Sequence, residues 1–143
     1  MIYLDTGCLV KLYYPEPESA KVVRLIAGQS IVLLAIHELE LSNALQLKLF
    51  RKEAKPSQVR ATRALVEEDI ATGVLHRPAV DWEDALRSAA ALSIAHTRST
   101  GCRSLDVLHC AAAQRVGAAS FITTDARQRR LALAIGLKCP LVS

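Results

Sequence analysis

Four acidic residues stand where a predicted strand ends or a predicted helix begins. Asp5 closes the short apolar run that opens the sequence, and Asp125 follows the β-branched and aromatic run at 120–123. Glu40 and Asp106 fall in the first turns of two predicted helices. In open α/β sheets the ligand site lies beyond the carboxyl ends of the strands, so we expect these four carboxylates to converge there.

Converging carboxylates need a cation, because like charges a few ångströms apart raise one another's pKa. Mg²⁺ and Mn²⁺ prefer hard oxygen ligands of this kind. Such a metal can activate water and neutralise charge on a phosphodiester during an in-line displacement. The four acids therefore predict metal-dependent hydrolysis of a nucleic-acid backbone.

Each acid also has a structural explanation. Asp125 can cap the helix that follows it, Asp106 suits the positive end of its helix dipole, and Glu40 can be a solvated surface residue. Asp5 is harder to explain in this way, because an acid at the end of an apolar strand is costly to bury. Glu38 competes with Glu40, since residues two apart on a helix point to nearly opposite sides.

Strands and helices are predicted to alternate along the chain. Apolar runs indicate strands, whereas apolar residues recurring at three- and four-residue steps indicate helices. This alternation implies an α/β fold with a parallel sheet and helices on both of its faces. The expected strands are 2–5, 31–35, 74–80, 120–123 and 138–142, and the expected helices are 19–27, 37–52, 56–71, 81–101, 104–116 and 126–135.

The composition is that of a small protein with an aliphatic core. With 143 residues the chain is expected to form a single domain, 1–143, without a disulfide or structural metal. Hydrophobic residues make up 51% and aromatic residues only 4%, and no apolar stretch is long enough to cross a bilayer, so we expect a cytoplasmic protein with no membrane partner. The spacing of the four cysteines argues against a zinc site. A formal charge of +4 is compatible with a polyanionic partner.

The whole pattern resembles the PIN domain family, and within it the VapC-like toxin ribonucleases of type II toxin–antitoxin systems. Four segments carry the resemblance in the family's order, and they span nearly the whole chain. One departure is Gly7-Cys8, where the family often has Ser-Ala. The segments are 2–12 with Asp5 and Thr6, 40–45 with Glu40, 104–111 with Asp106, and 121–125 with Asp125.

The resemblance implies a PIN-like three-layer α/β/α fold with a mainly parallel central sheet, and a Mg²⁺- or Mn²⁺-dependent endoribonuclease. It also implies an RNA substrate, a small antitoxin partner and a homodimer. The spacing of the acids in the family selects Glu40 rather than Glu38. The expected catalytic residues are Asp5, Glu40, Asp106 and Asp125, with Asp5, Asp106 and Asp125 as metal ligands and Thr6, Arg103, Thr123 and Arg127 as RNA-binding or supporting residues.

Two other interpretations remain open. The chain could be a PIN-like domain that binds RNA or protein without catalysis, or another Mg²⁺-dependent phosphohydrolase. A haloacid-dehalogenase-like phosphatase would need a second acid two residues after its nucleophile, where this chain has Gly7. His109 lies one helical turn after Asp106 and could line the cleft. Lys11 and Arg98 are further candidates for phosphate contacts.

Overall fold

Four short parallel strands form the centre of the fold. The computed structural model describes residues 1–143, and its strands pair in the order β3-β2-β1-β4. Every pairing is parallel, as the alternation of strands and helices predicts. The strands are β1 (Ile2–Leu4), β2 (Ile31–Val32), β3 (Leu75–His76) and β4 (Ser120–Ile122).

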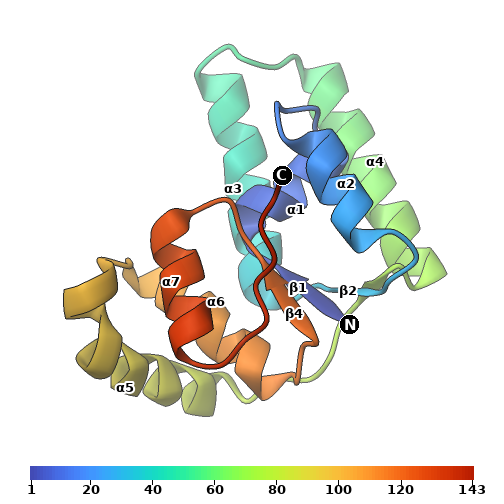
Figure 1. Cartoon of the computed structure of the whole chain (residues 1–143). Coiled ribbons are helices and arrows are strands. Elements are labelled where there is room, and N and C mark those ends of the chain that lie inside the picture. The colour runs from blue at the N-terminus through green and yellow to red at the C-terminus, as the bar shows by residue number, and fades with distance from the viewer.

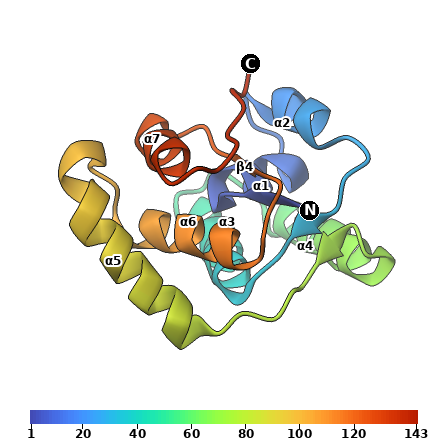
Figure 2. The same ribbon diagram turned by 60° about the horizontal axis from the view of Figure 1, so that its bottom comes forward.

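Helices cover both faces of this sheet and complete the three-layer α/β/α arrangement. Figures 1 and 2 show α5, α6 and α7 gathered on one side of the strands, with α1, α2 and α4 on the other. None of the helices is long and apolar enough to span a membrane. The helices are α1 (Thr6–Tyr13), α2 (Ser19–Ile26), α3 (Ala35–Phe50), α4 (Pro56–Thr72), α5 (Trp82–Thr100), α6 (Ser104–Arg115) and α7 (Ala126–Ala134).

Two hydrophobic clusters, one for each face of the sheet, hold the layers together. Successive side chains of a strand point to opposite faces. Tyr3 and Phe121 accordingly pack in the cluster that contains residues of α5, α6 and α7, whereas Leu4 and Ile122 pack in the cluster formed with α1, α3 and α4. All four cysteines are buried and unpaired, so they pack as small hydrophobic residues.

The register of β1 and β4 brings two parts of the predicted site together. Leu4 pairs with Ile122, so both strands end at the same level of the sheet. The next residue, Asp5, donates its backbone amide to the Ile122 carbonyl at 3.0 Å. Asp5 and Thr123 therefore become neighbours although 117 intervening residues separate them in the chain.

Helix caps fix where the site helices begin. Asp5 is the N-cap of α1 and accepts a hydrogen bond from the Cys8 amide, and Asp125 is the N-cap of α7 and accepts from the Arg127 amide at 2.8 Å. Gly101 ends α5 in the left-handed conformation at φ 73°, which glycine adopts without strain. The chain can thus turn directly from α5 into α6, which carries Asp106.

The prediction of a last strand at 138–142 is wrong. This segment is irregular and makes one backbone hydrogen bond to the sheet, from the Phe121 amide to the Lys138 carbonyl at 2.8 Å. Pro140 has no amide hydrogen, so it cannot continue a ladder. The expected strand at 74–80 is also much shorter than predicted, since only Leu75 and His76 pair before Pro78.

Candidate active site

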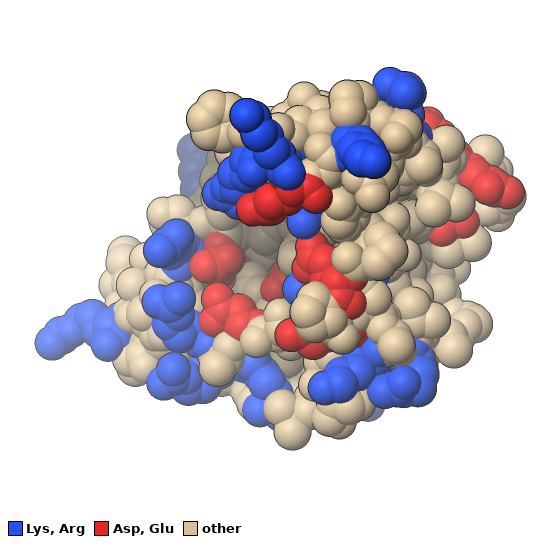
Figure 3. Space-filling model, turned by 90° about the horizontal axis from the view of Figure 1, so that it is seen from above, with Lys and Arg blue, Asp and Glu red and all other residues tan.

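A groove of about 550 Å³ opens at the carboxyl ends of the strands. Three of the four predicted acids line it, namely Glu40 from α3, Asp106 from α6 and Asp125 at the start of α7. Arg103 and Arg127 lie along the same walls. Figure 3 looks onto this side of the molecule and shows acidic side chains around a hollow, with Lys and Arg side chains at its margins. We call this feature the acidic groove.

Asp5, the fourth predicted acid, is not part of the groove wall and lies buried. Its Oδ1 accepts the Cys8 amide at 2.7 Å, and its Oδ2 accepts a short hydrogen bond from the Thr123 hydroxyl. Burial raises the pKa of Asp5, and the hydrogen bonds from Thr123 and Cys8 oppose this change. The structure therefore makes Asp5 the most deeply held carboxylate of the four.

Thr123 links the buried acid to the groove. Its hydroxyl accepts the Asp125 amide at 3.0 Å and faces two acceptors, Asp5 and the Oε1 of Gln128 at 2.9 Å. Gln128 in turn donates to the Asp106 carbonyl at 3.3 Å and is almost fully buried. Sequence reasoning missed Gln128, although a Gln three residues after the N-cap Asp125 is a recognisable signal at a helix start.

Glu40 is held from beneath by two side chains. Its Oε1 accepts the Thr6 hydroxyl at 2.8 Å and contacts the Nε2 of His109 at 2.5 Å. Partial burial alone would raise the pKa of Glu40, but these hydrogen bonds outweigh it and hold its pKa below the usual value. Glu40 is thus kept as a carboxylate at the edge of the acidic groove.

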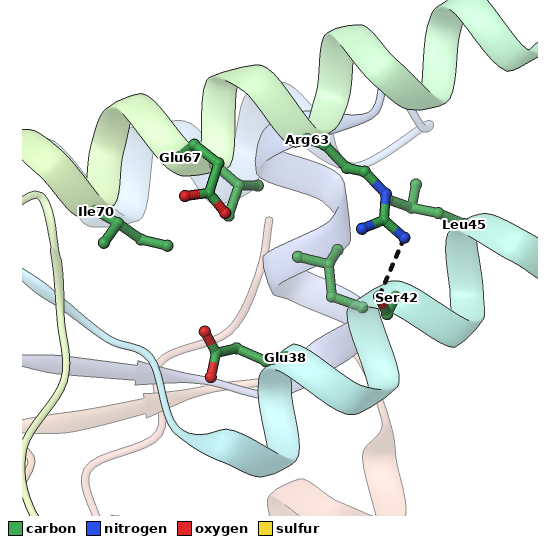
Figure 4. A pocket seen from close by; sticks show the side chains of 8 residues that line it. Glu38, Ser42, Leu45, Arg63, Glu67 and Ile70 are labelled. Carbon is green, nitrogen blue, oxygen red and sulfur yellow. Dashed lines mark hydrogen bonds between the residues drawn. The ribbon is translucent and has the colours of Figure 1, made fainter.

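Glu38, the competing acid, points to a different part of the molecule. It pairs with Arg77 and lines a separate cavity of about 350 Å³ between α3 and α4. Figure 4 shows Glu38 in this cavity opposite Glu67, while the Arg63 side chain reaches across to Ser42. Helical phase thus brings Glu40, and not Glu38, to the acidic groove, which the sequence alone left open.

His109 does not line the groove but lies directly beneath it, with 2% of its surface exposed. Its Nδ1 is 2.7 Å from the hydroxyl of Tyr3, which is fully buried. Sequence reasoning missed Tyr3, because a tyrosine in a short apolar strand has the pattern of an ordinary core residue. Only the position of β1 beneath α6 shows that this hydroxyl reaches a histidine.

The predicted cations divide into two groups. Arg103 and Arg127 line the acidic groove, and the Nε of Arg127 is 3.8 Å from Asp125. Lys11 instead pairs with Glu16 at 3.2 Å, away from the groove walls, and Arg98 is exposed outside them. Only the two arginines beside the motif acids are therefore placed to meet a ligand there.

The donor chemistry of the groove fits a hydrated Mg²⁺ or Mn²⁺ ion. No three Asp, Glu, His or Cys side chains are grouped closely enough to enclose a metal. Mg²⁺ does not require such a cage, because it usually keeps several waters and binds one or two carboxylates together with substrate phosphates. Asp106 and Asp125 offer carboxylates on the same groove, and Thr123 connects Asp125 to the buried Asp5.

Comparisons with known proteins agree with this architecture. The family model described as PIN domain matches residues 2–134. Among solved structures, the crystal structure of FitAcB from Neisseria gonorrhoeae is similar at 18% identity and a TM-score of 0.68, covering 99% of this chain and 98% of that one. The crystal structure of VapBC2 from Rickettsia felis bound to a DNA fragment from their promoter gives 18% identity and a TM-score of 0.62, covering 98% of each chain. Comparison with curated protein sequences gives no match.

Proposed function

The chain belongs to the PIN domain family, and we propose that it is a Mg²⁺- or Mn²⁺-dependent endoribonuclease, the toxin of a type II toxin–antitoxin pair. One observation carries the proposal. Glu40, Asp106 and Asp125, from three separate segments of the chain, line a single groove, and Thr123 links Asp125 to the buried Asp5. A nuclease needs this concentration of negative charge, whereas a domain that only binds RNA is better served without it, because phosphates repel carboxylates.

The metal, when bound, would activate a water molecule and neutralise charge on the scissile phosphate. Asp5, Asp106 and Asp125 are the residues that we propose hold it. Asp5 is oriented by the Cys8 amide and by Thr123, so its carboxylate needs little reorganisation to accept an ion. Attraction to the cation would then offset the desolvation penalty of burying this charge.

Glu40 is the acid that we propose acts on water or on the leaving oxygen. It is exposed enough to reach the groove, yet its Oε1 is held by Thr6 and His109. Because its pKa lies below the usual value, Glu40 is a carboxylate at neutral pH, which is the form in which a general base accepts a proton. Thr6 is thus proposed as a supporting residue of Glu40, and Thr123 as a supporting residue of Asp5.

Cationic side chains offer a path for the RNA backbone. Arg103 and Arg127 line the acidic groove, and a second groove of about 530 Å³ shares Asp125 with it. This second groove carries Arg129 and Arg130 together with Lys21 on its walls. We propose that phosphates flanking the cleaved bond lie along these cations, since phosphate contacts fix the position of a nucleic acid without reading its sequence.

The partner proteins are also part of the proposal. The resemblance to VapC-like toxins and the likeness in fold to VapBC2 support a small antitoxin as one partner and a second copy of the chain as the other. Co-expression with the protein encoded beside it, followed by size-exclusion chromatography with light scattering, tests both. A monomer that no neighbouring protein binds would remove this part of the proposal and leave the nuclease untouched.

Cleavage of RNA by matched variants tests the activity. The variants are Asp5→Asn and Glu40→Gln, with Glu38→Gln as the control two residues away on the same helix. Asn at position 5 can still cap α1, so folding should be retained. We expect wild type and Glu38→Gln to cut RNA only with Mg²⁺ or Mn²⁺, and the two site variants to lose at least about 100-fold in rate.

Three other outcomes would contradict the proposal. Equal cleavage by all four proteins would point to a contaminating nuclease. RNA binding without cleavage under any metal would favour the non-catalytic binder. Release of phosphate from small phosphate esters, with RNA left intact, would favour another phosphohydrolase.

A further inference from the structure

A buried chain of hydrogen bonds runs beneath the acidic groove and ends on Glu40. The Tyr3 hydroxyl lies 2.7 Å from Nδ1 of His109, and Nε2 of the same ring lies 2.5 Å from Oε1 of Glu40. The Thr6 hydroxyl reaches the same Glu40 oxygen at 2.8 Å and lies 3.3 Å from His109. Tyr3, His109 and Glu40 come from β1, α6 and α3, so these hydrogen bonds join three separate elements of the fold.

The donors and acceptors along this chain can be assigned from their chemistry. A glutamate kept in its charged form only accepts hydrogen bonds, so Nε2 of His109 must carry a hydrogen and donate a hydrogen bond to Glu40. Burial raises the pKa of Tyr3 well above its usual value, so its hydroxyl keeps the proton that Nδ1 accepts. Each hydrogen bond that links Tyr3, His109 and Glu40 thus has one donor and one acceptor.

A neighbouring histidine shows what a purely structural ring looks like in this fold. His37 is also fully buried, and its ring centroid lies 4.9 Å from that of His109. Both of its ring nitrogens bind backbone, with Nδ1 accepting the Leu34 amide and Nε2 donating to the Leu4 carbonyl. His109 makes no such backbone bond. Both of its ring nitrogens contact side chains, Tyr3 and Glu40, and Glu40 lines the acidic groove.

We propose that His109 is a positioning residue, fixed by Tyr3, that holds Oε1 of Glu40 against the protein so that the rest of the carboxylate faces the acidic groove. This inference rests on the proposed function, because it assigns a role within that site. An unrestrained glutamate side chain would lose rotational freedom about several bonds when it binds a metal-bound water. Residues that orient the side chains of a metal site in this way typically contribute about 10- to 100-fold in affinity or activity.

Three variants separate positioning from a structural role. His109→Leu removes the donor, His109→Gln replaces it with an amide N–H, and Tyr3→Phe removes only the hydroxyl that fixes the ring. We expect His109→Leu to lower kcat for RNA cleavage about 10- to 100-fold with little change in KM, and His109→Gln to recover most of that loss. Tyr3→Phe should give a smaller loss of kcat with the same unchanged KM.

Wild-type kcat in folded His109→Leu would overturn the inference, as would a His109→Gln enzyme as slow as His109→Leu. Where His109→Leu does not fold, Tyr3→Phe and His109→Gln decide the result. Wild-type kcat in Tyr3→Phe together with an inactive, folded His109→Gln would then overturn it.

Binding of Mn²⁺ without RNA distinguishes this inference from the proposed function. Glu40 would contact the ion only through a metal-bound water, so we expect His109→Leu to weaken Mn²⁺ binding about tenfold in a calorimetric titration, and to have no further effect when Glu40 is already Gln. A loss that persists in the Glu40→Gln background would show a structural role and overturn the inference. If wild type cuts no RNA while Mn²⁺ binding follows the expected pattern, the positioning role stands and the proposed ribonuclease activity fails.

Discussion

The burial of His37 predicts that the protein becomes less stable as the pH falls. Its Nδ1 accepts the Leu34 amide at 3.0 Å and its Nε2 donates to the Leu4 carbonyl at 2.8 Å, so the ring joins the end of β1 to the start of α3. An imidazolium has no acceptor nitrogen and would turn an N–H toward the Leu34 amide. The folded protein therefore requires the neutral ring, and protonation of His37 must oppose folding.

The magnitude follows from the pKa of the ring. Burial, followed by the nearby His109, lowers the pKa of His37 from 6.5 to about 3. Because the folded pKa lies below the unfolded one, the stabilisation is complete above about pH 6.5 and is lost as the pH falls toward 3. Each pH unit in this window costs up to about 1.4 kcal/mol, so about 2 kcal/mol of the free energy of unfolding is lost by about pH 5.

Urea unfolding at several pH values between about 7.5 and 5 measures this loss. The reference variant is His37→Gln, because a glutamine at this helix position can still accept the Leu34 amide but cannot titrate. The other acids titrate in both proteins and cancel in the difference. His76→Gln is the control, since its side chain is exposed in the folded protein. A stability difference between wild type and His37→Gln that stays constant over this range would refute the reasoning.

Three further predictions concern the site and the core. Thr123→Val removes the hydroxyl between Asp5 and Asp125, so it should lower the free energy of unfolding by about 1–3 kcal/mol in urea denaturation and reduce RNA cleavage. Arg127→Ala should raise KM for RNA and weaken its salt dependence, whereas Arg87→Ala, on the exposed surface of α5, should change neither value. The four cysteines are buried and burial raises their pKa, so a thiol reagent should modify them in native protein far more slowly than in urea.

Local patterns in the sequence predict most of the fold. The helices at 56–71 and 104–116 are confirmed almost to the residue, because periodicity, first-turn residues and terminal glycines act within a few positions of one another. The last strand was wrong for the opposite reason. Whether an apolar segment pairs with a sheet depends on a free edge and an unbroken series of amides, which Pro140 interrupts.

The candidate site divides in the same way. The sequence by itself indicated where carboxylates follow strands or open helices, since each such position is a local property of Asp5, Glu40, Asp106 or Asp125. It did not distinguish Glu40 from Glu38 by residue pattern, because only the packing of α3 against its neighbours sets which side faces the groove.

Tertiary structure alone decided what supports these acids. The hydrogen bonds from Tyr3 to His109 and from Thr123 to Asp5 join residues that are 106 and 118 positions apart. Such contacts are created by strand order and register, which place β1 beside β4 and α6 behind them. No local pattern carries that information, because the residues involved meet only after the chain has closed its parallel crossovers.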